Sequence, residues 1–152
     1  MTNNVSAFQH LLVATDFSEQ SRKALAVACD LSRHYGSTLT LIHVFPVPGY
    51  VLPEGFIAAG PEVLVEVENR SRATLETWKA EAIESGATEV DIVTAIGNPG
   101  PEIVRLAKTG KFTAIVVGTH GRTGLTGFIL GSVAHKVVTL AECPVVTVPF
   151  RT

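Results

Sequence analysis

Five apolar runs alternate with helix-like segments along the chain, and this alternation constrains the fold more than any other feature. The runs cover residues 10–15, 38–45, 90–96, 112–117 and 144–149. Each run is nearly continuous in hydrophobicity, which is typical of a strand that is buried on both faces of its sheet. Because amphipathic segments lie between the runs, the pattern predicts βαβ units in an open parallel sheet with right-handed connections.

Four helices are predicted between these strands, at about residues 18–36, 61–86, 98–110 and 133–138. Ser18 and Asn98 have the short polar side chains that N-cap positions favour, so each is expected to begin a helix. The apolar side of the second helix is predicted from its helical spacing to carry Val63, Val67, Leu75, Trp78 and Ile83.

The segment between the fourth run and the last helix is rich in glycine, with glycines at positions 118, 121, 124, 127 and 131. A helix N-terminus presents unpaired N–H groups, and glycines let the backbone approach a ligand closely. The segment therefore predicts a phosphate cradle. Its spacing is neither that of a Walker A loop nor that of the dinucleotide fingerprint. The alternative is an ordinary strand-to-helix loop whose glycines only supply turns.

The spacing Gly118, two residues, Gly121, nine residues, Gly131-Ser132 resembles the ATP-binding motif of the universal stress protein family. The resemblance extends from about residue 8 to residue 150. It implies a three-layer, Rossmann-like α/β fold, with helices on both faces of a five-stranded parallel sheet of order 3-2-1-4-5. The length suits one domain, so residues 1–152 are expected to form a single nucleotide-binding domain.

In that strand order, the first and fourth strands end at one crevice, where open α/β sheets bind ligands. Asp16 is expected there as the acceptor of a hydrogen bond from a nucleoside hydroxyl or amine. The alternative role for Asp16 is a favourable position beside the first helix N-terminus. Val44 matches the family position whose backbone binds adenine, although it is equally consistent with a simple core valine.

The phosphates are expected at the start of the last helix. Ser132 is predicted to bind a phosphate oxygen, with helix capping as the alternative, and Val133 and Ala134 add backbone donors. Arg122 is predicted to reach the outer phosphates or a partner, and a surface arginine is the alternative. The predicted nucleotide-binding residues are Ala14, Thr15, Asp16, Val44, Gly118, Thr119, Gly121, Arg122, Gly131, Ser132, Val133 and Ala134.

Charge and composition argue against several classes of partner. The net charge is −2 and basic residues form no run, which argues against nucleic acid and membrane surfaces. Residues 1–17 lack the basic start of a signal peptide, and apolar runs stay below the ~18 residues of a membrane span. A cytoplasmic protein is expected. The two cysteines fit no metal spacing, so no metal site within the protein is predicted.

The sequence offers no complete catalytic set, because phosphoryl transfer normally needs a metal-holding carboxylate, a cation and a positioned nucleophile. The favoured function is an ATP-binding regulatory module of the stress response, with at most slow hydrolysis. ATP with Mg²⁺ is the expected ligand, and ADP or AMP are the alternatives. Two other hypotheses are a slow ATPase or phosphotransferase and a partner-binding dimer that binds no nucleotide.

Self-association and an unidentified protein partner are also expected. The last strand, Val145–Val148, lies at a predicted sheet edge and is expected to pair in a homodimer, within the limits set by Pro144 and Pro149. The segment Pro46–Pro61 is predicted to be a long loop. Its apolar side chains make it either a docking element or a lid over the nucleotide: Tyr50, Val51, Leu52 and Phe56.

Overall fold

The centre of the fold is a sheet of five parallel strands, seen in a computed structural model that describes residues 6–120 and 130–150. The strands are β1 (His10–Ala14), β2 (Thr38–Phe45), β5 (Glu89–Ile96), β6 (Ala114–Gly118) and β7 (Val145–Val148). Their spatial order is β5-β2-β1-β6-β7. Counted along the chain, these strands have the order 3-2-1-4-5, so the predicted fold class and topology are confirmed.

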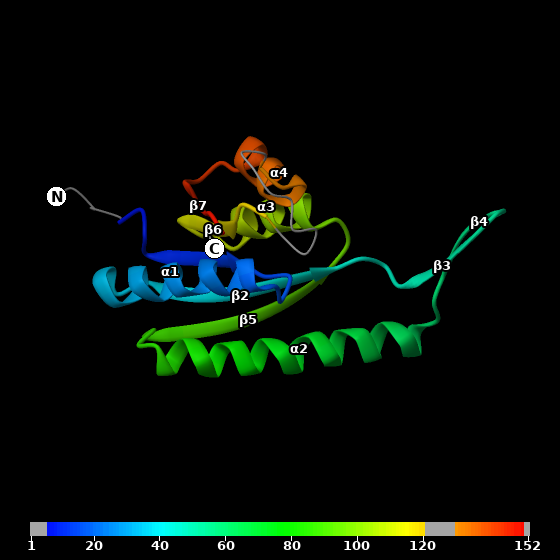
Figure 1. Cartoon of the computed structure of the whole chain (residues 1–152), viewed down its shortest axis with the longest axis horizontal. Helices are drawn as coiled ribbons and strands as arrows, with labels where there is room; N and C mark the ends of the chain where they lie inside the picture. The colour runs from blue at the N-terminus through cyan, green and yellow to red at the C-terminus, as the bar shows by residue number, and fades with distance from the viewer. Residues whose placement is uncertain (1–5, 121–129, 151–152) are drawn as a thin grey trace.

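Four helices cover the two faces of this sheet (Figure 1). They are α1 (Glu19–Tyr35), α2 (Pro61–Glu84), α3 (Pro99–Thr109) and α4 (Ser132–Leu140). Successive residues of a strand point to opposite faces. Leu11 and Val13 of β1 accordingly pack with α1 and α2, whereas Leu12 and Ala14 pack with α3 and α4. The three layers follow from this alternation.

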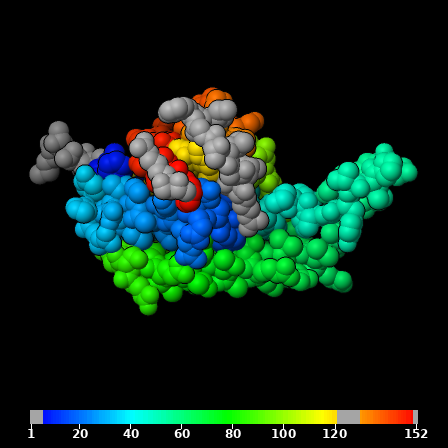
Figure 2. All heavy atoms as spheres, in the orientation of Figure 1, coloured from blue at the N-terminus to red at the C-terminus, as the bar shows by residue number. Residues whose placement is uncertain are grey.

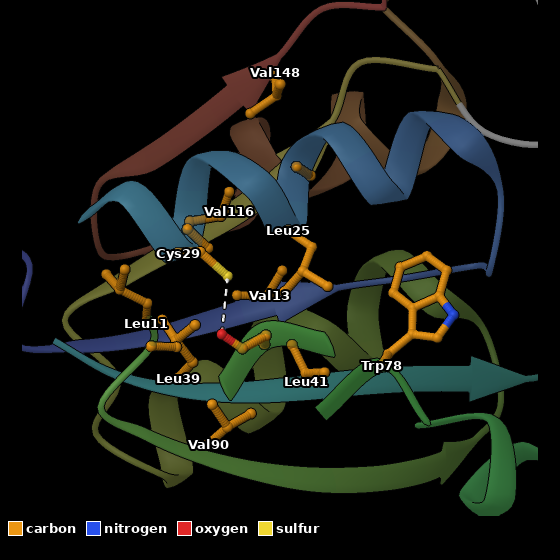
Figure 3. Close-up of a cluster of buried hydrophobic side chains, with 14 of the residues drawn as sticks. Leu11, Val13, Leu25, Cys29, Leu39, Leu41, Trp78, Val90, Val116 and Val148 are labelled. Atoms are coloured by element: carbon orange, nitrogen blue, oxygen red, sulfur yellow. Dashed lines mark hydrogen bonds between the residues drawn. The ribbon is translucent and has the colours of Figure 1, made fainter. Parts of the chain in front are cut away.

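The face covered by α1 and α2 holds the larger of the two apolar clusters (Figure 3). Leu41 of β2 and Leu75 of α2 are fully buried in it, and Trp78 closes one end. Cys29 of α1 belongs to the same cluster and its thiol makes a weak hydrogen bond to the carbonyl oxygen of Ala82. The continuous apolar runs of the sequence are thus explained by burial from both sides.

The register of the central strands decides where the sheet ends. Ala14 lies beside Ile42 of β2, and Val13 lies beside Val116 of β6. The chain therefore leaves β1 and β6 at the same edge of the sheet, on neighbouring strands. This is the switch point between the two halves of the sheet, as predicted, and ligands bind at such points in open α/β folds.

The helix boundaries agree with the predicted ones, and the predicted apolar side of α2 needs one correction. Ser18 caps α1, because its hydroxyl oxygen accepts a hydrogen bond from the N–H of Ser21 at 3.2 Å. Asn98 occupies the predicted N-cap position of α3, and its side chain makes no capping hydrogen bond. Val63 and Ile83 of α2 are 40% and 50% exposed, so they do not belong to its buried side as predicted. The N-terminal part of α2 extends beyond the strands of the sheet (Figure 1).

The segment Pro46–Pro61 is not a plain loop, which corrects the prediction. It contains an antiparallel hairpin of β3 (Gly49–Leu52) and β4 (Gly55–Ala58). Pro53 and Glu54 form its turn, and Gly55 follows with φ at +134°, a conformation that favours glycine. Two apolar runs around a Pro-x-Gly turn are a hairpin signal that the length of the segment obscured.

Candidate functional site

A cavity of about 270 Å³ opens at the carboxyl ends of β1, β2 and β6, where α3 and α4 begin. Ten of the twelve predicted nucleotide-binding residues line it. They are Ala14, Thr15, Asp16, Val44, Gly118, Thr119, Gly131, Ser132, Val133 and Ala134. Gly121 and Arg122 lie outside the described residues. Residues far apart in the sequence thus surround one space.

The turn after β1 holds Asp16 at the cavity by a set of short hydrogen bonds. Its Oδ1 accepts from the hydroxyl of Ser21 at 2.6 Å and from the N–H of Ser18 at 3.0 Å. The N–H of Asp16 donates to the Ser21 hydroxyl oxygen at 3.1 Å. Asp16 therefore faces the N-terminus of α1, where the helix dipole favours a carboxylate. The predicted helix-terminal role is observed, and Asp16 lines the cavity at the same time.

Phe17 gives this turn its shape by an unusual backbone conformation. Its φ is +65°, which bulky residues adopt only when their surroundings hold them there. The Phe17 ring stacks on His43 with 4.3 Å between centroids, and it meets the edge of Trp78 at 5.7 Å. The Nδ1–H of His43 donates to the carbonyl oxygen of Thr15 at 2.9 Å, so His43 supports the same turn from β2.

The start of α4 forms the opposite wall. The N–H of Gly131 donates to the carbonyl oxygen of Thr119 at 2.6 Å, and the Thr119 N–H donates to the Val148 carbonyl oxygen at 3.0 Å. A Cβ on Gly131 would lie only 2.8 Å from the Thr119 oxygen. Gly131 is therefore required by the close approach of two backbone segments, a reason independent of any ligand.

The first turn of α4 has the character of an anion site. Gly131 occupies the N-cap position, and Ser132, Val133 and Ala134 are the first three helical residues. The N–H groups at these positions have no acceptor within the helix, and the positive end of the dipole lies there. Since Ser132 is the first helical residue and not the N-cap, the capping alternative for its hydroxyl is wrong. Its side chain is exposed at the cavity.

His120 is the most informative residue of the wall outside the predicted nucleotide-binding set. Its Nδ1 lies 3.0 Å from the hydroxyl oxygen of Thr119. Its Nε2 is buried and has no hydrogen-bond partner among the residues that the structure describes. Buried polar atoms nearly always have a partner, so an unsatisfied nitrogen on the cavity wall is consistent with a water molecule or a ligand in this space.

The sequence prediction also missed five further residues of the cavity wall. They are Ser21, Ile42, Pro99, Ile103 and Val117. Ser21 had a detectable signal, since it follows the N-cap Ser18 by three residues, the spacing at which side chains reach back to a cap. The four apolar residues had no such signal, because a core residue and a cavity residue have the same sequence pattern.

The wall is chemically divided. One part is apolar and comes from β2, α3 and β6, with Ile42, Val44, Ile103 and Val117 as members. The other part holds Asp16 and the hydroxyl and N–H groups of the α4 start. This division suits a ligand with a flat apolar ring at one end and an anion at the other.

Neither a metal centre nor a reactive thiol is present in the part of the chain described. Among residues 6–120 and 130–150, no three His, Cys, Asp or Glu side chains cluster as metal ligands. Burial raises the pKa of the Cys29 thiol and of the Cys143 thiol, so both remain protonated and unreactive at neutral pH. A membrane-crossing helix is likewise absent from these residues, because none combines the necessary length and apolar character.

The comparison with known sequences agrees with the geometry. Residues 7–149 match the model of the Universal stress protein family. The chain is 37% identical over 150 residues to the universal stress protein YxiE of Bacillus subtilis, covering 93% of this chain and 99% of that protein. It is 31% identical over 148 residues to universal stress protein MJ0531 of Methanocaldococcus jannaschii, covering 96% and 85% of the two chains.

Solved structures support the same assignment. The structure of the protein MJ0577 superposes with a TM-score of 0.75 at 25% identity, covering 97% of this chain and 99% of that one. A universal stress protein in complex with cAMP superposes with a TM-score of 0.73 at 25% identity, covering 94% and 98%. Fold, cavity position and sequence therefore agree, and the chain belongs to the universal stress protein family.

Proposed function

We propose that this protein binds an adenine nucleotide, with ATP as the ligand, in the cavity at the ends of β1 and β6. We further propose that it acts in the cytoplasm as a nucleotide-dependent regulatory module of the stress response. One observation carries the proposal: the open first turn of α4 and the apolar pocket of β2 and α3 line the same cavity. A structural relative, a universal stress protein, is described in complex with cAMP, which supports an adenine nucleotide.

The proposed orientation follows from the two parts of the wall. The phosphates lie at the N–H groups of Ser132, Val133 and Ala134, where the helix dipole favours anions. The adenine lies against the apolar part, near the backbone of Val44. Asp16 then accepts a hydrogen bond from the nucleoside, with the carboxylate oriented by Ser18 and Ser21.

Mg²⁺ is proposed to enter with the nucleotide. Asp16 is the one carboxylate among the described residues of the wall, so the protein provides few ligands of its own. Mg²⁺ commonly binds through one or two carboxylates, several waters and the phosphates of the substrate. When bound, the ion would neutralise phosphate charge, which is also the chemistry that phosphoryl transfer needs.

Slow hydrolysis is the second function that the site supports. The described wall residues supply one carboxylate, Asp16, and no lysine or arginine, whereas fast phosphoryl transfer uses both kinds of charge. Turnover is therefore proposed to be slow. A preparation in which ATP hydrolysis persists after the substitution Ser132→Asp owes that activity to a contaminating enzyme.

Pairing of two chains through β7 is proposed as the assembly. β7 is bonded to β6 alone in the described sheet, and Val145–Val148 leave the other edge unpaired. Unpaired strand edges tend to pair with another chain. Light scattering on the protein at micromolar concentration tests this point, and a monomer would contradict it.

The experiment for the nucleotide is direct. Freshly purified protein is denatured, the released small molecules are identified by mass spectrometry, and ATP with Mg²⁺ is titrated against thermal unfolding. A ligand present at 100 times its dissociation constant adds about 2.7 kcal/mol to the free energy of unfolding, which raises the melting temperature measurably. Absence of both bound nucleotide and thermal shift would favour a partner-binding module without nucleotide.

A further inference from the structure

The β3–β4 hairpin, residues 49–58, forms an arm that projects from the body of the protein (Figures 1 and 2). Its two strands pair antiparallel, with Tyr50 opposite Ile57 and Val51 opposite Phe56. Every residue of the arm is exposed. The described residues that line the cavity include none from the arm, which argues against the lid interpretation.

Both faces of the arm are apolar. Opposed residues of a hairpin lie on the same face and neighbours in a strand alternate. Tyr50, Leu52 and Ile57 therefore form one face, and Val51 and Phe56 form the other. Val51 is 86% exposed, Tyr50 is 69% exposed, and Phe56 and Ile57 are each more than half exposed. A hairpin that packs against its own protein buries one face and presents a polar face to solvent. This arm presents apolar side chains to solvent on both faces.

The amount of apolar surface is that of an interface. The arm and the exposed Val63 and Val65 at the start of α2 together offer an area of roughly 700 Å², against the ~800 Å² per partner of a stable complex. Patches above a few hundred Å² on a soluble protein mark interaction sites. An isolated two-stranded hairpin is also only marginally stable in water, so a partner would stabilise it.

Three features favour a second copy of the same chain as that partner. Glu54 is the single charged residue of the arm, so the surface lacks the charge pattern that would select a charged partner. Strongly apolar interfaces are typical of homodimers. The start of α2 lies beside the arm in the chain and offers Val63 and Val65 as a receiving surface, so one patch contains both complementary parts.

We propose that the arm is a self-association element, and that two chains related by a two-fold axis each place their arm against the arm and the α2 start of the other. Tyr50 and Phe56, the largest side chains of the two faces, are the anchors of this interface. This interface is separate from the β7 edge and does not depend on nucleotide binding. A titration that detects no nucleotide binding would therefore not contradict the proposed self-association.

The test is the molar mass in solution, measured by light scattering after size exclusion at about 5 µM and about 200 µM protein. Four proteins are compared: the natural chain, the double variant Tyr50→Ser/Phe56→Ser, the conservative variant Tyr50→Phe, and Ile83→Ser. Ile83 is a matched control, since it is 50% exposed at the other end of α2. Circular dichroism and thermal unfolding confirm that each variant is folded.

The proposal predicts that the double variant has half the molar mass of the natural chain, in multiples of 16.1 kDa. Tyr50→Phe and Ile83→Ser retain the natural mass. A natural chain that is monomeric at the higher concentration would overturn the proposal, and so would a double variant of unchanged mass. If the double variant changes the nucleotide dissociation rate but not the mass, the arm is a lid and the proposal is wrong.

Discussion

The cavity and the arm differ in what holds them in place. The backbone around the cavity is fixed by hydrogen bonds at Thr119 and Gly131 and by the stacked rings of Phe17 and His43, so these residues also serve the fold. The arm makes its own hairpin bonds, and its side chains are exposed. A change that disturbs this framework, as at Gly131, should therefore alter stability together with binding, whereas a change in the arm should alter association alone.

The largest effect is expected for Gly131→Val in the cavity wall. Its Cβ would lie 2.8 Å from the Thr119 carbonyl oxygen, so the start of α4 must move. We expect a loss of about 1–3 kcal/mol in the free energy of unfolding and more than a tenfold loss of nucleotide affinity. Chemical denaturation measures the free energy of unfolding, and calorimetric titration measures the nucleotide affinity. The control is Gly60→Ser, since a Cβ on Gly60 meets nothing within 4 Å.

An intermediate effect is expected at Phe17. Both Phe17→Ala and Phe17→Gly remove the ring contacts with His43 and Trp78, but only glycine adopts the positive φ without strain. The glycine variant should be more stable than the alanine variant by about 1 kcal/mol. Urea denaturation compares them. An alanine variant of equal or greater stability would show that the positive φ is not maintained in solution.

The smallest effect is expected in the arm. Ile57→Ser removes an apolar side chain that is 55% exposed and lies outside both apolar clusters of the fold. The free energy of unfolding of the dissociated chain, measured by denaturation at low protein concentration, should change by less than about 0.5 kcal/mol. A larger loss would show that the arm packs on the body, and the contrast between the two regions would fail.

The sequence predicted the sheet well because its information is local. Continuous apolar runs predict buried strands, and Gly131-Ser132 at the end of the glycine-rich segment predicted the start of α4. The strand order came from the family resemblance. The register of β1 and β6 then brings the predicted residues together without further information.

What the sequence did not predict depends on tertiary contacts. His120 Nε2 has no hydrogen-bond partner among the described residues, which only the packed structure can show. The close backbone approach at Gly131 and the positive φ of Phe17 are also products of packing. Val63 and Ile83, near the two ends of α2, are exposed although their helical spacing places them on its apolar side, because spacing does not report how much of a helix its neighbours cover.

The most direct test of the central claim is nucleotide affinity in Ser132→Asp, with Gly60→Asp as the matched control. Both variants place a carboxylate at a helix N-terminus, where the dipole favours it, so the free energy of unfolding should be maintained in each. We expect Ser132→Asp to lose ATP binding by more than tenfold through repulsion of the phosphates, while Gly60→Asp binds as the natural chain does. Equal affinity in the two variants would contradict the assignment of the phosphates to α4.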